Sequence, residues 1–396
     1  MKIALFSETY PPYINGVATH VEMLKNTFEK LGHEVLVVTV GSEKLEEIEI
    51  KNNVVYVPGI YIKKIYGYRI ATPIGPKREK IAIDFDPDII HVHNEFGIGE
   101  SGLRVAKKKN LPIVYTLHSE YDEFLFYVGL KYFEKLSQGV ASKYFKRFFE
   151  KSTIVVSPSK KAQNYMDRMK IDKKVVVLNN AVEFEKFKMT PEKEAFRKEF
   201  REKYSLSDNT KAFVFVGRIG NEKNIMELLE NWVYSDFARE DAVLFVIGKG
   251  PDDEKIKNYI EENGFQDRII QYGPVPNKEI GNYLAAMDYY TTASLSEMHS
   301  ISMLEAMASG LPALIKLDVP NKEQIIEGMN GFQWDTKEEF KELFSRIINL
   351  SKEDQEQLKK NVLRYSLEND NYNQAKKLLQ IYEDAIYMKK QELEEE

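Results

Sequence analysis

The sequence predicts an α/β protein of two doubly wound, Rossmann-like domains that face each other across a cleft. Strand-like apolar segments alternate with amphipathic helical ones through the first half of the chain. The same alternation starts again after residue 210. The length, 396 residues, also exceeds that of one ordinary domain.

The first half begins with a buried strand and an amphipathic helix. That helix, at 20–33, has apolar residues at helical spacing and is closed by Gly32. The strands that follow end in polar residues, as strands do where a parallel sheet presents its ligand-binding edge. The expected strands are 2–7, 34–41, 53–59, 88–94, 112–118, 153–159 and 175–182.

The second half repeats the pattern after a charged, poorly periodic stretch at 183–210. We interpret that stretch as a linker with one short helix. From residue 337 the chain is helical and ends in a long helix at 371–391, followed by a solvated acidic tail. The expected strands are 212–218, 242–250, 269–275, 288–294 and 311–318.

The composition excludes several classes of protein. Hydrophobic content of 43% with 12% aromatic residues can build cores, which excludes a disordered chain. The absence of cysteine excludes disulfides and thiolate sites and fits a reducing compartment. A net charge of −6 argues against a nucleic-acid partner. No apolar run approaches the ~20 residues of a spanning helix, and the apolar start is too short for a signal peptide.

Two segments of the first half are both basic and aromatic. Residues 61–80 carry six basic residues and one acidic residue, and 131–151 carry six basic residues among aromatic ones. At helical spacing Phe145, Phe148 and Phe149 share one face. These aromatic side chains either fill the core beneath an amphipathic helix or lie, with the basic residues, on anionic lipid.

An acidic motif follows the expected strand at 288–294. Glu297 lies in the loop and Glu305 in the helix that this loop enters. Ser300, Ile301 and Ser302 would offer backbone N–H groups at the start of that helix, which is a site for an anion. Carboxylates that accept hydroxyl hydrogen bonds beside a phosphate-sized anion site suit a nucleotide sugar.

Other polar residues also follow expected strands. Arg218 and Lys223 follow the strand at 212–218, where two cations can clamp a diphosphate or simply occupy a solvated loop. Gly16 precedes the first helix and would let the backbone approach a phosphate or sugar, although Asn15-Gly16 is also an ordinary turn dipeptide.

Histidines lie at the ends of two expected strands. His118 could bond a sugar hydroxyl or an acceptor, or be a capped structural histidine. His91 and His93 face one side of a strand, and Glu95 is the nearby third ligand that a zinc site would need. We expect no metal there, because Glu95 is the one candidate to complete the set.

The motifs FVGRIGNEKN, YGPVPNKEI and SLSEMHSISMLEAMASGLP together resemble retaining glycosyltransferases of family four, which have the GT-B fold. The resemblance covers nearly the whole chain, including FSETYPPYINGVATHV and the C-terminal helix. It implies that Glu297 contacts the donor sugar, that Glu305 holds the ribose, and that Arg218 and Lys223 bind the diphosphate.

The same resemblance implies further roles. His118 corresponds to a histidine that contacts the sugar, and Gly16 to a glycine loop. The backbone at 272–275, which ends at Val275, corresponds to the segment that binds the base. In such enzymes the leaving phosphate takes the proton of the acceptor, so we expect no cofactor, metal or protein nucleophile.

Finer details are similar to family members that glucosylate lipids. We therefore expect a UDP-sugar, UDP-glucose in the first instance, as donor and a membrane lipid such as diacylglycerol as acceptor. An N-terminal domain at 1–185, with the returning helix at 376–396, would bind the acceptor and dock on an anionic membrane surface. A C-terminal domain at 186–375 would bind the UDP-sugar. The expected location is the cytoplasm, peripherally on the inner face of the cell membrane.

Three alternatives remain at this point. The chain could transfer a sugar to a soluble sugar, a protein or a small molecule. It could be a UDP-sugar epimerase, which would be active without any acceptor. It could also be a non-catalytic partner built on a degenerate transferase, although the four charged residues of the two motifs are all present.

Overall fold

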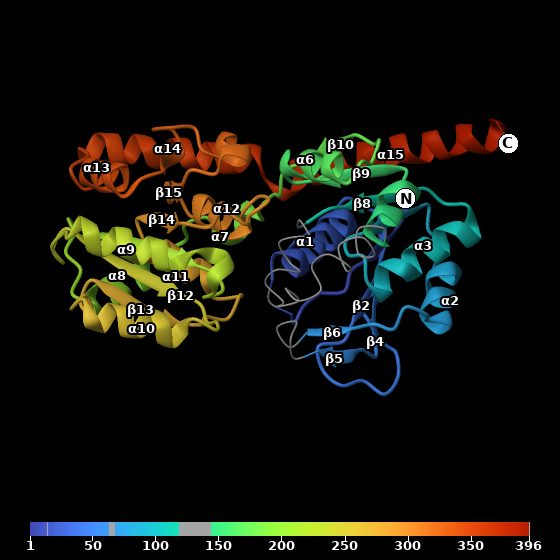
Figure 1. Ribbon diagram of the computed structural model, residues 1–396, viewed down its shortest axis with the longest axis horizontal. Helices are drawn as coiled ribbons and strands as arrows, with labels where there is room; N and C mark the ends of the chain where they lie inside the picture. Colours follow the sequence, from blue (N-terminus) through green and yellow to red (C-terminus); the bar gives the residue numbers. More distant parts are fainter. Residues whose placement is uncertain (14, 63–67, 119–143, 396) are drawn as a thin grey trace. The chain divides into compact units, whose positions relative to one another are not determined.

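The computed structural model describes residues 1–13, 15–62, 68–118 and 144–395, and the chain divides into two compact units (Figure 1). Unit 1 consists of 1–180 and 371–396, and unit 2 of 181–370. The chain passes from unit 1 to unit 2 after residue 180 and returns after residue 370, in each case five residues before the expected boundary, at 185 and 375. Val182 is already buried in the core of unit 2, and Asn371 Nδ2 already donates to Thr27 Oγ1 in unit 1 at 2.8 Å.

Unit 1 is built on a sheet with the strand order β10-β9-β8-β7-β1-β2-β4-β3. The described strands pair in parallel except β3, which runs antiparallel to β4. A separate antiparallel hairpin is formed by β5 (Ile60–Ile62) and β6 (Tyr68–Ile70). The strands of the large sheet are β1 (Lys2–Phe6), β2 (Glu34–Val40), β3 (Glu49–Lys51), β4 (Val54–Val57), β7 (Ile89–Val92), β8 (Ile113–Thr116), β9 (Ile154–Ser157) and β10 (Val175–Val177).

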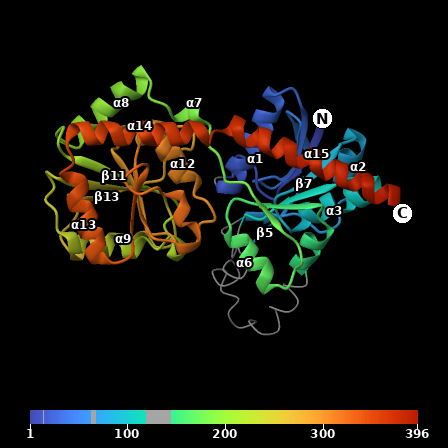
Figure 2. The ribbon, with the colours of Figure 1, turned by 90° about the horizontal axis from the view of Figure 1, so that it is seen from above.

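Helices cover the sheet of unit 1. The helices α1 (Gly16–Lys30) and α15 (Asn371–Glu395) lie against each other on one face (Figure 2). Phe28 of α1 and Tyr382 of α15 are buried there in one core with the strands. The C-terminal helix therefore belongs to unit 1, as expected. The remaining helices are α2 (Pro76–Phe85), α3 (Gly97–Lys109) and α6 (Lys161–Arg168).

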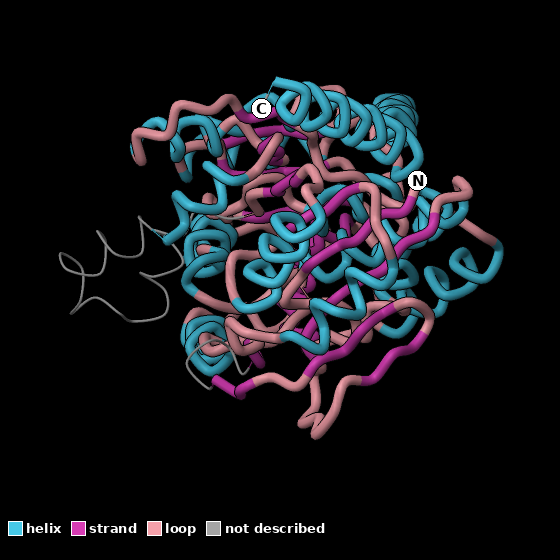
Figure 3. The backbone as a smooth tube through the Cα atoms, turned by 90° about the vertical axis from the view of Figure 1, so that its right-hand side faces the viewer, coloured by secondary structure: helices cyan, strands magenta, loops and turns pink. Residues whose placement is uncertain are grey.

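Unit 2 has a parallel sheet with the order β13-β12-β11-β14-β15-β16. Side chains alternate between its two faces: Phe213 and Phe215 of β11 pack into one core, and Val214 packs into the other. Helices cover the strands here as they do in unit 1, where the tube of Figure 3 shows helices in cyan and strands in magenta. The strands are β11 (Lys211–Val216), β12 (Ala242–Ile247), β13 (Ile269–Gly273), β14 (Tyr289–Thr292), β15 (Ala313–Lys316) and β16 (Gly331–Trp334).

The stretch at 183–210 is not a linker, which corrects the prediction. It forms two helices of unit 2, and Phe187 and Phe200 bury their rings in one of its cores. Thr190 caps the second helix by accepting a hydrogen bond from Lys193 N. The helices of unit 2 are α7 (Phe184–Phe187), α8 (Pro191–Lys203), α9 (Ile225–Ser235), α10 (Asp253–Glu262), α11 (Ile280–Ala286), α12 (Ile301–Ala308), α13 (Lys337–Ile348) and α14 (Lys352–Glu368), with 3₁₀ turns η2 (Asn221–Lys223) and η3 (Val319–Gln324).

Each unit has one point at which the order of its strands reverses. In unit 2 the chain runs outward through β11, β12 and β13, then restarts with β14 on the other side of β11. In unit 1 the corresponding neighbours are β1 and β7. Open α/β sheets bind ligands at the carboxyl ends of such neighbouring strands. The predicted α/β class with two doubly wound domains is confirmed, and the switch points mark where ligands are expected.

Among the described residues, no helix combines the length and the apolar character that crossing a bilayer requires.

Candidate active site

The loops after β11 and β14 meet at the switch point of unit 2. Lys223 from the first loop forms an ion pair with Glu297 from the second. The hydroxyls of Ser294 and Ser296 donate to the carbonyl oxygen of Glu222, at 3.4 and 2.7 Å. These contacts bring the predicted diphosphate-binding cation next to the predicted sugar-binding carboxylate.

Arg218 is held beside this pair by its own carboxylate. Its Nε lies 2.9 Å from Oε1 of Glu222, one helical turn further along the chain. The side chains of Arg218 and Lys223 are only 28% and 24% exposed. Both cations are therefore partly buried and paired with carboxylates, and their binding of a diphosphate stays a prediction.

The start of α12 lies in the same place. Ser300 is its N-cap, and the side chain accepts a hydrogen bond from Met303 N at 3.3 Å. Ser302 Oγ lies 3.0 Å from the hydroxyl of Tyr290, in β14, which fixes the first turn against the sheet. Because the cap satisfies the N–H of Met303, the N–H groups of Ile301 and Ser302 remain available to an anion.

Glu305 lies one turn further into α12 and is buried. Burial raises the pKa of its carboxyl from 4.5 to about 7; Lys186 opposes this shift and Glu183 adds to it. Both neighbours belong to the segment around α7, which contacts α12. A carboxyl with this pKa is part neutral and part ionised at physiological pH, so a hydroxyl ligand that favours the ionised form would change its charge.

Backbone contacts connect this site to the loops after β12 and β13. Gly248 has φ +151° and its N–H donates to the carbonyl of Gly273 at 3.0 Å. A Cβ at Gly248 would lie 1.8 Å from the carbonyl oxygen of Gly217, so only glycine fits. Val275 follows β13 and packs, half-buried, against the core of unit 2. The predicted base-binding segment is therefore tied to the β11 loop through one intervening strand.

The other two predicted residues belong to unit 1. Gly16 opens α1, whose N-cap Asn15 accepts a hydrogen bond from Ala18 N at 2.9 Å. His118 follows β8, and its ring centroid lies 5.3 Å from that of His20 on α1. The structure thus places His118 against α1, at His20, which lies one helical turn after Gly16.

The histidines of β7 do not form the set considered from the sequence. His91 is held from both sides: Nδ1 lies 2.6 Å from the Tyr382 hydroxyl and Nε2 lies 2.7 Å from Thr116 Oγ1. Among the described residues, the ligating atoms that come together belong to His20, His93 and His118, without Glu95. The sequence analysis missed His20, although its position four residues after Gly16 was a usable signal.

The basic, aromatic segment at 131–151 is described only from residue 144. Phe145, Phe148 and Phe149 are all buried in unit 1. Arg147 is paired with Glu100. For these three aromatic residues the core interpretation is confirmed and the lipid interpretation is wrong. The residues at 131–143, and those at 63–67 in the other basic segment, lie outside the described residues.

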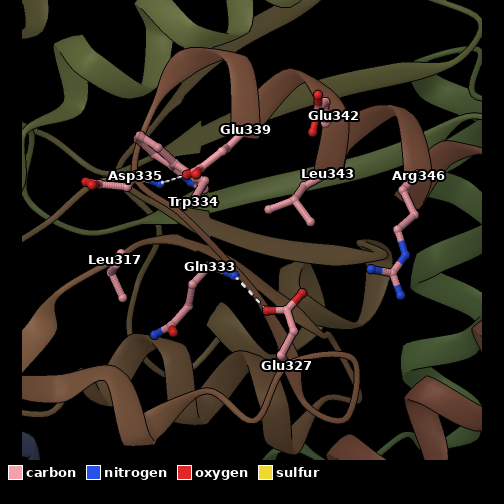
Figure 4. Close-up of a pocket in the computed structure, with 9 residues that line it drawn as sticks. All are labelled: Leu317, Glu327, Gln333, Trp334, Asp335, Glu339, Glu342, Leu343 and Arg346. Atoms are coloured by element: carbon pink, nitrogen blue, oxygen red, sulfur yellow. Dashed lines mark hydrogen bonds between the residues drawn. The ribbon is translucent and has the colours of Figure 1, made fainter.

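A hollow of about 600 Å³ lies elsewhere in unit 2, between β16 and α13 (Figure 4). Two of its carboxylates accept hydrogen bonds from nearby backbone: Glu339 from Asp335 N at 2.8 Å and Glu327 from Gln333 N at 3.3 Å. None of the predicted site residues lines this hollow. It is therefore separate from the candidate site at the switch point.

Comparisons with known proteins identify the two halves. Residues 14–186 match the family described as Glycosyltransferase Family 4, and residues 196–364 match Glycosyl transferases group 1. The two matches follow each other and together span most of the chain. The chain is a glycosyltransferase, with a family-four domain followed by a group 1 domain.

Several relatives of this glycosyltransferase carry names. The chain is 29% identical to the alpha-monoglucosyldiacylglycerol synthase of Acholeplasma laidlawii, over 86% of each chain. It is also 29% identical to the enzyme of the same name from Streptococcus pneumoniae, over 79% of this chain and 70% of the relative. A GDP-mannose-dependent alpha-mannosyltransferase of Mycolicibacterium smegmatis is 24% identical over 84% of this chain and 86% of its own length.

The fold of the glycosyltransferase is also found in solved structures. Sucrose-phosphate synthase from Thermosynechococcus elongatus superposes with a TM-score of 0.75 at 17% identity, covering 97% of this chain and 98% of that one. This likeness concerns the fold alone. It supports the assignment of two Rossmann-like domains of the GT-B type.

Proposed function

We propose that this glycosyltransferase moves a hexose, glucose in the first instance, from a UDP-sugar to a membrane lipid such as diacylglycerol, with retention of anomeric configuration. The observation that carries the proposal is the 29% identity, over 86% of each chain, to an enzyme named for making alpha-monoglucosyldiacylglycerol. The residues at the switch point of unit 2 suit the donor half of this reaction.

The diphosphate of the donor would lie at the start of α12. Arg218 and Lys223 supply two positive charges, and Ile301 and Ser302 supply backbone N–H groups. Helix N-termini favour anions, and forked guanidinium bonds add to that attraction. Since the leaving diphosphate gains charge as the sugar departs, these groups stabilise the transition state more than the ground state.

The sugar and the ribose would be held by the two carboxylates. Glu297 is already in contact with Lys223, so a hydroxyl bound to Glu297 lies near the cation that binds phosphate. Glu305, eight residues further on, would accept hydrogen bonds from the ribose. In this proposal His118 contacts the transferred sugar, as the resemblance to the family implies.

The reaction needs no protein nucleophile. The bond between the anomeric carbon and the phosphate oxygen breaks, and the acceptor oxygen bonds to the same face of the sugar. The proton of the acceptor hydroxyl moves to the leaving phosphate oxygen. The protein contributes position and charge stabilisation, which are the large terms when little covalent chemistry falls to side chains.

A lipid acceptor would require contact with a bilayer, and unit 1 has exposed apolar and basic side chains suited to it. Ile60, Tyr61 and Ile74 are 61%, 56% and 75% exposed. Lys77 and Lys80 lie close by in sequence on α2 and are also exposed. We call these five residues the hairpin surface. Exposed apolar side chains next to lysines favour the interface of an anionic membrane.

One assay tests the proposal. Nucleotide release is measured with UDP-glucose, UDP-galactose, UDP-N-acetylglucosamine and GDP-mannose, each with and without diacylglycerol in anionic micelles. We expect release with UDP-glucose that depends on diacylglycerol, and an α-linked glucolipid by NMR. If GDP-mannose is the one donor of the four that supports release, the donor is that of the mannosyltransferase relative instead. Release only with a soluble acceptor, or sugar isomerisation without any acceptor, would overturn the lipid proposal.

A further inference from the structure

Three histidines gather at the carboxyl edge of the sheet of unit 1. His93 follows β7, His118 lies two residues after β8, and His20 belongs to α1. One ring nitrogen from each lies within 4.8 Å of the other two. Their rings are also in contact, with centroid distances of 5.3 Å from His118 to each of the other two and 5.8 Å between His20 and His93.

The hydrogen bonds of the neighbouring His91 show what a structural histidine looks like in this core. Its two ring nitrogens both have partners, on Tyr382 and Thr116. Two of the three clustered histidines differ. Nδ1 of His20 and Nε2 of His93 are buried and have no hydrogen-bond partner among the described residues. Buried polar atoms without partners are rare and call for an explanation such as a bound water or ion.

The contact between His93 and His118 has a length that fits either a hydrogen bond or a shared ion. Nδ1 of His93 and Nε2 of His118 are 3.0 Å apart. In a tetrahedral zinc site with Zn–N bonds of 2.0–2.1 Å, two ligand nitrogens are about 3.3 Å apart. Two imidazole nitrogens at this separation can share one proton, or they can share one metal ion with little movement of either ring.

The type of ligand also suits a metal. Imidazole nitrogen is the commonest metal ligand among protein side chains. Nitrogen ligands of this kind select zinc, copper, nickel and cobalt over magnesium and calcium.

We propose that His20, His93 and His118 form a binding site for a divalent transition metal of the Zn²⁺ class, with water as the fourth ligand. Its occupancy would keep His118 from the transferred sugar and so inhibit the transferase. The inhibition rests on the proposed function, in which His118 contacts the sugar. The binding of the metal does not rest on it.

The binding test uses the full-length, untagged protein after treatment with a chelator. Zn²⁺ is titrated by calorimetry and Co²⁺ by its visible absorption, with no donor or acceptor present. We expect one ion per chain, with a tetrahedral Co²⁺ spectrum. H20N, H93N and H118N should each weaken binding by about 100-fold or more, since each removes one of three ligands.

His33 gives the matched control, because it lies outside the cluster at the end of α1. H33N should bind like the original protein. Circular dichroism and the unfolding temperature are recorded for every variant. If H20N or H93N fails to fold, the test depends on H118N, because His118 is only half-buried and its replacement disturbs the core less. No stoichiometric binding, or equal affinity in H33N and H118N, would overturn the proposed site.

Inhibition is measured separately, once a donor and acceptor are known. Zn²⁺ should inhibit the original protein and H33N reversibly, with activity restored by chelator, while the remaining activity of H20N should not respond. An enzyme that binds Zn²⁺ at the cluster but keeps full activity would overturn the inhibitory role. A protein inactive with every donor would overturn the proposed function and leave the binding result standing.

Discussion

The two units present different chemistry at equivalent places in the same kind of sheet. At the switch point of unit 2, cations and carboxylates are paired: Arg218 with Glu222 and Lys223 with Glu297. At the switch point of unit 1, the side chains are buried and burial favours their neutral forms. It raises the pKa of Glu8 to about 7, holds that of Glu95 well above 4.5 and holds that of His93 well below 6.5.

This difference suggests a division of labour. A charged, partly exposed edge can exchange its internal ion pairs for the charges of a diphosphate. A buried edge of neutral polar groups is poor at holding a diphosphate but suits uncharged hydroxyls or a nitrogen-ligated metal. The experiments below test whether charge recognition belongs to unit 2 and neutral recognition to unit 1.

The largest effect is expected from the cations of unit 2. R218A and K223A should each lower kcat/KM by about 10²-fold or more, because each removes charge-assisted bonds to the developing diphosphate. The control is K255A, since Lys255 is an exposed cation on α10 of the same unit. Steady-state kinetics with the active donor decides it. Near-normal turnover in both variants, with intact folding, would remove the diphosphate from this edge.

A second effect should separate the two carboxylates. E305A should weaken binding of UDP and UDP-sugar alike, by about 10-fold or more, since the lost bonds are to the ribose. E297A should weaken UDP-sugar more than UDP, because its partner is the transferred sugar. E297A also removes the ion-pair partner of Lys223. The uncompensated positive charge would strengthen the binding of UDP, not weaken it. Calorimetric titration of both ligands measures this, and equal losses in both variants would show the roles are misassigned.

The pH dependence of UDP binding sharpens the role of Glu305. The ionised carboxylate is the better acceptor for ribose hydroxyls, and a group with pKa near 7 is about one-tenth ionised at pH 6 and nine-tenths at pH 8. Affinity for UDP should therefore rise with pH, by up to about tenfold across this range. UDP itself titrates near pH 6, so the measured quantity is the difference from E305Q, in which this component should be absent. Parallel pH profiles for both proteins would contradict the role.

Much of this arrangement could be predicted from local sequence, because local rules determine it. Apolar runs that end in polar residues located the strands and the site loops, and Gly310 and the acidic motif located α12. The ion pair of Lys223 with Glu297 joins residues 74 positions apart, and nothing in the spacing of either motif shows that they touch.

The errors have the same origin. The stretch at 183–210 is charged enough to read as a linker, yet Phe187, Phe200 and Leu206 bury it in unit 2. The periodicity of Phe145, Phe148 and Phe149 revealed one apolar face but not what covers it. His20 joined the histidine cluster through α1, whose approach to β7 and β8 depends on tertiary packing. Contacts between distant segments decide each of these, and no local propensity encodes them.

The smallest expected effect concerns the membrane and the hairpin surface of unit 1. In the basic segment at 131–151, Lys143 lies outside the described residues and Arg147 is paired with Glu100. The exposed apolar residues Ile60, Tyr61 and Ile74 are the sharper choice.

Replacing Ile60, Tyr61 and Ile74 together by Ser should lower partitioning onto anionic vesicles about threefold, because the variant loses apolar burial but keeps the lysines. Replacing Lys77 and Lys80 instead should matter most at low ionic strength, since salt screens exposed charges. The control, I326S with L367S, removes two apolar side chains of unit 2 that are 46% and 48% exposed. Calorimetry should show unchanged UDP binding in every variant, because all predicted diphosphate contacts belong to unit 2. If the control lowers binding to vesicles as much as the hairpin variant does, the hairpin surface is not the membrane-binding surface. The lipid acceptor would then need another route to the enzyme.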